Sequence, residues 1–357
     1  MESNFKIFTY NVLSSSYATP KTYPNVSLSL LNDKNRWSKF LKILTEQFKE
    51  NSIILLQEVS EKWKGRIQVL TKKNNYTALI TSYSHFHSGF MGTAMLIPNI
   101  YEILKVKYIR PCSLAEKFYT RDKNNEEDED EDENEDEDEN EDVNLVNNFL
   151  LDLFNPNLYI NFAYYMFGVG DRNSFKKNIQ SDIFSLNDII GKKLNVQTMV
   201  VLKINNKSFA VCTYHAPLIL NDELSQFGSS ICSLKAAYDF AEDLPLILAG
   251  DFNFLPTSDS YKLFTGQINK NKNMTSAYYK HNGSEPKYTT KCQIKFHFEK
   301  KINTFEGTLD YIFFKDVNLL NCNIYLPFSN TFNNNKVFLP SEDNPSDHLP
   351  MCATFEC

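Results

Sequence analysis

The sequence predicts an α/β fold in which two packed β-sheets lie between outer helices. Short apolar segments typical of strands outnumber the stretches with helical periodicity, and such a ratio favours sheet packed on sheet. The chain has 357 residues, of which 42% are hydrophobic and 14% aromatic, so a substantial core is possible.

The N-terminal part begins with alternating strand and helix signals. Strands are predicted at residues 5–10, 53–57 and 93–97, because each is a short run rich in apolar side chains. Between the first two strands, apolar residues recur at spacings of three and four and predict a helix: Trp37, Phe40, Leu41, Leu44 and Phe48.

The C-terminal part continues the same pattern. Strands at 198–204 and 208–214 flank Asn205-Asn206-Lys207, which predicts a tight hairpin turn. A second helix is predicted from a further set of periodic apolar residues: Leu224, Phe227, Ile231, Leu234 and Phe240. The remaining predicted strands are residues 244–249, 309–314, 321–326 and 349–355.

One acidic tract dominates the net charge of −7. Residues 126–142 contain 15 acidic side chains and no apolar one, so this tract cannot pack and is expected to be disordered. The rest of the chain has about eight more basic than acidic residues, which suits a polyanionic substrate. We expect one domain over 1–357, interrupted by an acidic insertion at about 122–144.

The seven cysteines are scattered, and no two form a Cys-x-x-Cys pair. An unpaired set of this kind predicts an intracellular, reducing compartment, with the cytoplasm as first choice, and argues against a zinc site. No apolar run has the length of a membrane span, and no segment indicates a protein partner.

Polar residues stand at the ends of several predicted strands, where a core strand would not place them. A single charged strand end is usually solvated, but six that mix carboxylate, amide and imidazole groups indicate one shared site. Such oxygen-rich groups suit Mg²⁺, with Mn²⁺ as the alternative. The six ends are Asn11, Gln57-Glu58, His215, Asp251 to Asn253, Asp310 and Asp347-His348.

These residues resemble the motifs of the endonuclease/exonuclease/phosphatase superfamily, whose fold is that of deoxyribonuclease I. The matching segments, in the expected order, are TYNVL at 9–13, LLQE at 55–58, YHAP at 214–217, GDFN at 250–253, LDYIF at 309–313 and SDH at 346–348. The resemblance implies a four-layer sandwich of two packed mixed β-sheets flanked by helices.

Finer motifs resemble the branch that contains deadenylases, nocturnin, angel and 2′,5′-phosphodiesterases. They are GDFNFLPTSDSYKLF at 250–264, FEGTLDYIFF at 305–314, LPSEDNPSDHLP at 339–350 and Asn35-Arg36-Trp37. The Thr-Asn-aromatic-Thr run that deadenylases use to read adenine is missing before Phe305, where only Asn303 is near. A preference for adenine is therefore left open.

The resemblance implies hydrolysis of a phosphate ester and assigns a catalytic role to five residues. Asp251 and Asn253 are expected to activate and orient the attacking water. His348 is expected to contact the scissile phosphate, with its tautomer fixed by Asp310, and His215 to be a second phosphate contact.

The same resemblance assigns metal and substrate contacts. Glu58 is expected to be the main Mg²⁺ ligand, with Asn11 beside it and Asp347 on the same metal side.

On the substrate side, Asn195 is expected to contact phosphate. Phe305 is expected to stack on a base, and Pro217 to form the other side of that slot.

The predicted function is a Mg²⁺-dependent phosphodiesterase that hydrolyses RNA, as a deadenylase-like 3′-5′ exoribonuclease releasing 5′-nucleotides. Two alternatives stay open. One is a phosphatase or phosphodiesterase on a small nucleotide or a phospholipid headgroup, and the other is a non-catalytic nucleic-acid-binding relative.

Overall fold

The computed structural model describes residues 4–83, 89–114, 193–220, 222–268, 273–296, 300–325 and 337–357. Their helices and strands lie in one compact unit formed by Met1–Ser113 and Lys192–Cys357. The acidic insertion predicted at about 122–144 lies outside the described residues, so the single-domain prediction stays a prediction.

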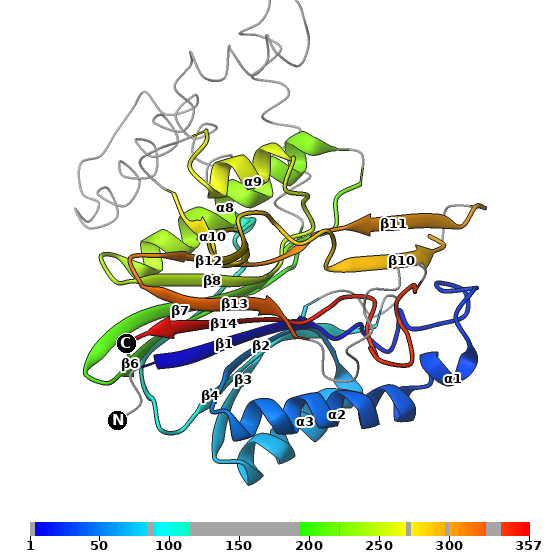
Figure 1. Ribbon diagram of the computed structural model, residues 1–357, viewed down its shortest axis with the longest axis horizontal. Coiled ribbons are helices and arrows are strands. Elements are labelled where there is room, and N and C mark those ends of the chain that lie inside the picture. The colour runs from blue at the N-terminus through cyan, green and yellow to red at the C-terminus, as the bar shows by residue number, and fades with distance from the viewer. Residues whose placement is uncertain are drawn as a thin grey trace, which may run out of the picture. The chain divides into compact units, whose positions relative to one another are not determined.

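Two six-stranded sheets make up the centre of this unit (Figure 1). The first has the order β13-β14-β1-β2-β4-β3: Leu319–Ile324, Met351–Glu356, Asn4–Asn11, Ile53–Ser60, Met91–Pro98 and Tyr76–Ile80. The second has the order β5-β6-β7-β8-β12-β9: Glu102–Ile109, Gln197–Ile204, Lys207–His215, Leu246–Asp251, Asp310–Lys315 and Thr275–Ser276. A separate hairpin pairs β10 (Thr290–Ile294) with β11 (Asn303–Gly307).

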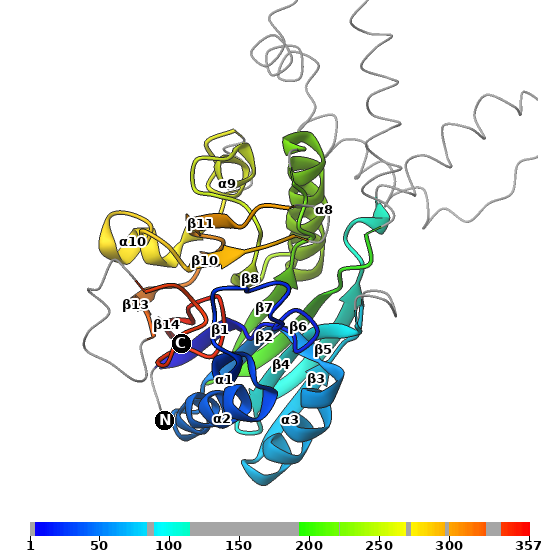
Figure 2. The ribbon, with the colours of Figure 1, turned by 90° about the vertical axis from the view of Figure 1, so that its right-hand side faces the viewer.

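Helices cover the outer face of each sheet, which confirms the predicted sandwich. The helices beside the first sheet are α1 (Leu28–Leu31), α2 (Asp33–Lys49) and α3 (Glu61–Lys73). Those beside the second are α8 (Glu223–Ala241) and α9 (Asp259–Phe264), whereas α10 (Ala277–Asn282) packs against β13 of the first sheet and β12 of the second. Figures 1 and 2 show α2 and α3 on the opposite side of the two sheets from α8 and α9.

Alternation along β1 shows how the sequence builds these layers. Phe5 and Ile7 belong to the core cluster between the two sheets, whereas Phe8 and Tyr10 pack toward the helices with residues such as Phe40. All four strand residues are at most 2% exposed, because successive side chains of a strand point to opposite faces. Burying each such side chain contributes about 1.5–3 kcal/mol.

Each sheet contains one parallel pair among otherwise antiparallel neighbours. In the first sheet β1 pairs in parallel with β2, and in the second β7 pairs in parallel with β8. Parallel neighbours end at the same edge of a sheet, so polar residues at their carboxyl ends are brought together. The fold thus collects the ends of four strands at one place.

The predicted hairpin is confirmed. Its two central residues, Asn205 and Asn206, have φ of 49° and 65°, which the short amide side chain tolerates and which matches the twist of the flanking strands. Small shifts occur elsewhere: the strand predicted at 244–249 begins at Leu246, after Pro245, and the one predicted at 321–326 begins at Leu319.

All seven cysteines are free thiols, and five of them are buried. Burial raises the pKa of the Cys112 thiol, so this side chain behaves as an apolar residue. Among the described helices, none has the length and apolar character that crossing a bilayer requires. The predicted compartment stays a prediction.

Candidate active site

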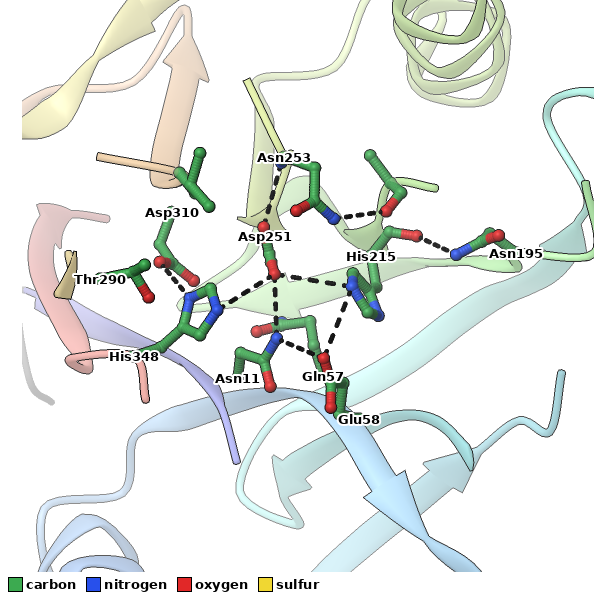
Figure 3. Close-up of polar contacts among 12 residues, drawn as sticks. Asn11, Gln57, Glu58, Asn195, His215, Asp251, Asn253, Thr290, Asp310 and His348 are labelled. Atoms are coloured by element: carbon green, nitrogen blue, oxygen red, sulfur yellow. Dashed lines mark hydrogen bonds and ion pairs between the residues drawn. The ribbon is translucent and has the colours of Figure 1, made fainter. Parts of the chain in front are cut away.

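The ends of β1, β2 and β8 meet in a hydrogen-bonded cluster (Figure 3). Nδ2 of Asn11 donates to Oε1 of Glu58 at 3.1 Å and to Oδ2 of Asp251 at 2.9 Å. Oδ1 of Asn11 accepts from the backbone N–H of Leu13 at 3.0 Å, which fixes the orientation of the amide. Asn11 therefore presents a hydrogen-bond donor to two carboxylates, and the metal contact predicted for it stays a prediction.

A β-bulge sets the position of Glu58. The register of β2 against β4 shifts between Leu56 and Val59, and Glu58 has φ of 57°. Positive φ is costly for a glutamate, and strain of this kind concentrates at functional sites. The bulge turns the carboxylate into the cluster, where Oε2 accepts from the backbone N–H of Ser14 at 2.9 Å.

Asp251 ends β8 after a glycine that the packing requires. Gly250 has φ of 153°, and a Cβ there would lie 1.9 Å from the carbonyl oxygen of Tyr214 on β7. Asn253, two residues after Asp251, has φ of 53°. Its N–H donates to Oδ1 of Asp251 at 3.0 Å, and its Nδ2 donates to the carbonyl of Ala216 at 2.8 Å. Asn253 therefore meets Asp251 through its backbone N–H while its side chain contacts Ala216, and the orienting role expected of the Asn253 amide stays a prediction.

Two histidines flank the Asp251 carboxylate. Nε2 of His215 lies 3.5 Å from Oδ2 of Asp251, and Nε2 of His348 lies 3.7 Å from the same oxygen. On its other side, Nδ1 of His348 is hydrogen-bonded to Oδ2 of Asp310 at 2.7 Å, as Figure 3 shows. Thr289 donates to that same oxygen of Asp310 at 2.6 Å.

Buried contacts hold the loop that carries His348 against the end of β1. Oγ of Ser346 donates to the carbonyl of Asn11 at 2.6 Å, and Nδ2 of Asn344 donates to the carbonyl of His348 at 2.7 Å. Asp347 accepts from the hydroxyl of Tyr23 at 2.5 Å. Asp347 therefore lies beside the cluster with its carboxylate occupied by a buried phenol.

Arg36, in the Asn-Arg-Trp motif near the start of α2, joins this loop to the segment after β1. It is 1% exposed, and its guanidinium donates to the carbonyls of Pro345 at 2.7 Å and of Val12 at 2.6 Å. A planar guanidinium has donors in fixed directions, so one side chain can fix two backbone segments relative to each other.

The electrostatics separate the roles of His348 and Asp251. Burial opposes the charged form of His348, but Asp310, Asp251 and Asp347 outweigh it and hold the pKa of the imidazole well above its usual value. Burial raises the pKa of Asp251, against the opposing effects of His348 and His215. A cationic imidazole beside a carboxylate of raised proton affinity is an arrangement typical of acid–base catalysis.

The cluster has the chemistry of a site for a hard divalent cation. Asp251, Asp310 and His348 form a possible metal site, because each offers an atom within 4.8 Å of the others. Oδ1 of Asp310 is buried without a hydrogen-bond partner among the described residues. Glu58 adds a further carboxylate, with its side chain 14% exposed. Such a carboxylate excess fits Mg²⁺ or Mn²⁺, and the identity of the ion stays a prediction.

The predicted substrate contacts lie at different depths. Nδ2 of Asn195 donates to the carbonyl of His215 at 2.9 Å, so this amide borders the cluster. Phe305 is half-buried on β11 and packs beside the small apolar cluster that contains Leu13. Pro217 is buried. The stacking slot predicted between Phe305 and Pro217 stays a prediction.

Sequence reasoning missed two side chains that contact the catalytic groups. Thr289 holds Asp310, and Tyr83 is hydrogen-bonded to Nδ1 of His215 at 2.6 Å. Neither stands in a recognisable motif, because both come from segments that meet the cluster only through the fold.

Comparisons with known proteins place these residues in context. No protein-family profile matches the chain. Over 134 residues it is 37% identical to nocturnin of Xenopus laevis, which covers 36% of this chain and 31% of nocturnin. Over 126 residues it is 27% identical to the CCR4-Not complex 3′-5′-exoribonuclease subunit Ccr4 of Yarrowia lipolytica, covering 33% of this chain and 18% of Ccr4. The matched region thus spans less than a third of either relative.

Solved structures are similar over almost the whole chain. The human nocturnin catalytic domain with bound sulfate has a TM-score of 0.59 and 18% identity, covering 99% of this chain and 93% of that domain. ANGEL2, a 2′,3′-cyclic phosphatase in complex with adenosine-2′,3′-vanadate, has a TM-score of 0.61 and 18% identity, covering 99% and 95%. These likenesses confirm the predicted fold, and with the sequence matches they confirm the resemblance that the motifs indicated.

Proposed function

We propose that the chain is a distant relative of nocturnin, Ccr4 and ANGEL2 within the endonuclease/exonuclease/phosphatase superfamily. On that basis we propose that it hydrolyses phosphodiester bonds in RNA. The specific reaction is 3′-5′ exonucleolytic release of 5′-nucleotides, dependent on Mg²⁺. The observation that carries the proposal is the position of Asp251, buried between two imidazoles and bonded to two asparagines.

Asp251 is the general base in this proposal. Its carboxylate takes a proton from the attacking water, and its raised pKa makes it a stronger base than an exposed aspartate. Asn11 and Asn253 hold the two carboxylate oxygens in place through separate hydrogen bonds. The water is then oriented by a carboxylate that cannot rotate, which reduces the entropic cost of attack.

His348 stabilises negative charge on the phosphoryl oxygens. The hydrogen bond from Nδ1 to Asp310 leaves Nε2 free to donate toward the substrate, and the raised pKa keeps the ring protonated at neutral pH. A preorganised cationic donor is worth most in a buried site, where solvent does not screen it. His215 supplies a second donor from the opposite side of Asp251.

Bound Mg²⁺ would polarise the phosphoryl oxygens as a Lewis acid. Glu58 is the ligand we propose first, because it is the most exposed carboxylate in the cluster. Asn11, which donates to Glu58, and Asp347, which accepts from Tyr23 in the segment after β1, are the further contacts that we propose on the metal side. The competing set is Asp251, Asp310 and His348, in which the Nδ1 atom of His348 is already engaged by Asp310.

Replacing Glu58 by Gln tests this choice. The variant is expected to weaken Mn²⁺ binding by about 10-fold or more, measured by isothermal titration calorimetry, because it removes a charged ligand. Glu61→Gln is the control, since that side chain is 54% exposed at the start of α3. If Asp310→Asn abolishes binding and Glu58→Gln does not, the ion is held by the Asp251, Asp310 and His348 set instead.

Three features support RNA as substrate. The chain outside the acidic tract is basic, which favours a polyanion. Phe305 is half-buried against the small apolar cluster that contains Leu13, two residues after Asn11, and an aromatic there can stack on a base. The relative Ccr4 is named a 3′-5′-exoribonuclease.

A second candidate is a phosphatase or phosphodiesterase acting on a small nucleotide or a phospholipid headgroup. ANGEL2 favours it, because that structural neighbour is a 2′,3′-cyclic phosphatase that binds an adenosine derivative. The non-catalytic alternative predicts loss of the acid–base residues. Asp251, Asp310 and His348 are all in place, which argues against it.

A substrate panel separates these candidates. Poly(A), mixed RNA, single-stranded DNA, 2′,5′-linked oligomers, NADP and RNA ending in a 2′,3′-cyclic phosphate are each incubated with Mg²⁺ or with EDTA. We expect 5′-nucleotides from unstructured RNA with Mg²⁺ only. Phosphate release from NADP or ring opening of the cyclic end, without RNA shortening, would favour the small-substrate candidate. No turnover of any substrate would support the non-catalytic one.

A further inference from the structure

Tyr83 lies behind His215 and touches the catalytic cluster from a segment with no motif. Its hydroxyl is 2.6 Å from Nδ1 of His215, and the side chain is 5% exposed. Two backbone hydrogen bonds to Met91, at the start of β4, fix the position of this residue. The phenol is therefore held in place by the sheet itself.

The direction of the hydrogen bond follows from the surroundings of the imidazole. Nε2 of His215 faces two carboxylate oxygens, Oδ2 of Asp251 at 3.5 Å and Oε1 of Glu58 at 4.0 Å, and a carboxylate oxygen can only accept. The proton of a neutral ring therefore belongs on Nε2, which leaves Nδ1 as an acceptor. The hydroxyl of Tyr83 is then the donor in the 2.6 Å hydrogen bond.

We propose that Tyr83 is a positioning residue that holds His215 in the Nε2–H tautomer. The single ring proton then faces Oδ2 of Asp251 at 3.5 Å, Oε1 of Glu58 at 4.0 Å and the substrate phosphate. This inference rests on the proposed function for the last of these contacts. It concerns a residue that the motif set does not contain.

The two histidines beside Asp251 are thereby controlled in opposite ways. A carboxylate, Asp310, accepts from Nδ1 of His348, whereas a phenol, Tyr83, donates to Nδ1 of His215. If both rings were held by carboxylates, the cluster would gain a further negative charge beside Glu58 and Asp251. The phenol fixes the second ring without adding charge, because the partner at Nδ1 decides which nitrogen carries the proton.

The tautomer can be tested without any substrate. In protein labelled with ¹⁵N at histidine, the two ring nitrogens of His215 are identified by comparison with His215→Ala. We expect Nδ1 unprotonated and Nε2 protonated in the wild type, and a mixture of tautomers in Tyr83→Phe. Nδ1 protonated in the wild type, or an unchanged Nε2–H pattern in Tyr83→Phe, would overturn the proposal. This readout also stands if the proposed RNA hydrolysis fails.

Kinetics test whether Tyr83 acts through His215. Tyr83→Phe is expected to lower kcat by about 5- to 10-fold with little change in KM, the loss typical of one hydrogen bond. In a His215→Ala background the same change should cost nothing further, because its partner is missing. Tyr76→Phe is the matched control: that buried hydroxyl bonds only backbone carbonyls of α2 among the described residues, so kcat should not change.

The outcomes are distinct. Equal losses from Tyr83→Phe in both backgrounds would show a general structural effect and would contradict the proposal. A full kcat in Tyr83→Phe would do the same.

Discussion

Replacing Asp251 by Asn is expected to lower kcat/KM for RNA by about 10³- to 10⁴-fold, because an amide cannot take the proton from the attacking water. The side chain has nearly the same shape, and Oδ1 can still accept from the N–H of Asn253, whereas the hydrogen bond from Asn11 to Oδ2 is lost because an amide nitrogen cannot accept. The loss should therefore appear in kcat rather than in KM. Initial rates over a range of RNA concentrations at saturating Mg²⁺ measure it.

The same substitution should leave the fold intact and change the pH dependence of stability. Burial raises the pKa of Asp251, so in the metal-free wild type the ionised group opposes folding at neutral pH and not below about pH 3.8. Asn removes that penalty. The free energy of unfolding of Asp251→Asn relative to the wild type is expected to rise from pH 3 to pH 7, as followed by urea titration.

The control for Asp251 is Asp316→Asn. That carboxylate is 60% exposed and pairs only with its neighbour Lys315 among the described residues, so activity should not change. A rate for Asp251→Asn within tenfold of the wild type would remove the general-base role. The water would then have to be activated by another group in the cluster.

Much of the fold could be predicted because buried strands and helices have apolar residues at regular spacings in the sequence. The strand β1 alternates between two cores, and Trp37 to Phe48 repeat at helical spacing. The strand β5 was missed although Leu104, Val106 and Tyr108 alternate with lysines. This edge strand is largely exposed, and these three apolar side chains are themselves exposed, so the alternation does not mark a buried face.

The β10–β11 hairpin has no such periodic pattern of apolar residues. Its sequences, TKCQI and NTFEG, are polar, and the pairing is supported by contacts with the loop before β14: Thr290 bridges to His348, and the N–H of Leu339 donates to the carbonyl of Lys291. Contacts of this kind depend on chain segments that are distant in sequence. Periodicity along one segment cannot report them.

The candidate site divides in the same way. The carboxylates and imidazoles could be recognised because an aspartate or a histidine at the end of an apolar strand, such as Asp251 or His215, indicates a functional site. The contacts that orient them were not, because the bulge at Glu58, the direction of the Asn11 amide and the phenol of Tyr83 arise from tertiary packing. The sequence thus predicted which side chains belong to the candidate site, and the fold determines which of their atoms face one another.

His348→Ala should be almost as damaging as loss of the base. It removes a buried cationic donor, and kcat/KM for RNA is expected to fall by about 10²- to 10⁴-fold. The raised pKa of His348 means that the protonated ring persists above pH 6.5. On the alkaline side the wild-type rate is therefore expected to fall only as the pH rises through this raised value, and on the acid side it falls as Asp251, the proposed base, becomes protonated.

The Asp310→Asn variant tests whether the rate depends on the protonated form of His348. Without the carboxylate at 2.7 Å from Nδ1, the pKa of His348 should fall, and the alkaline decline of kcat should move to lower pH. In a His348→Ala background Asp310→Asn should have little further effect, since the two act as a unit. His281→Ala, at an exposed position on α10, is the control and should match the wild type. An unchanged pH profile in Asp310→Asn would mean that the charge on His348 does not contribute to the reaction.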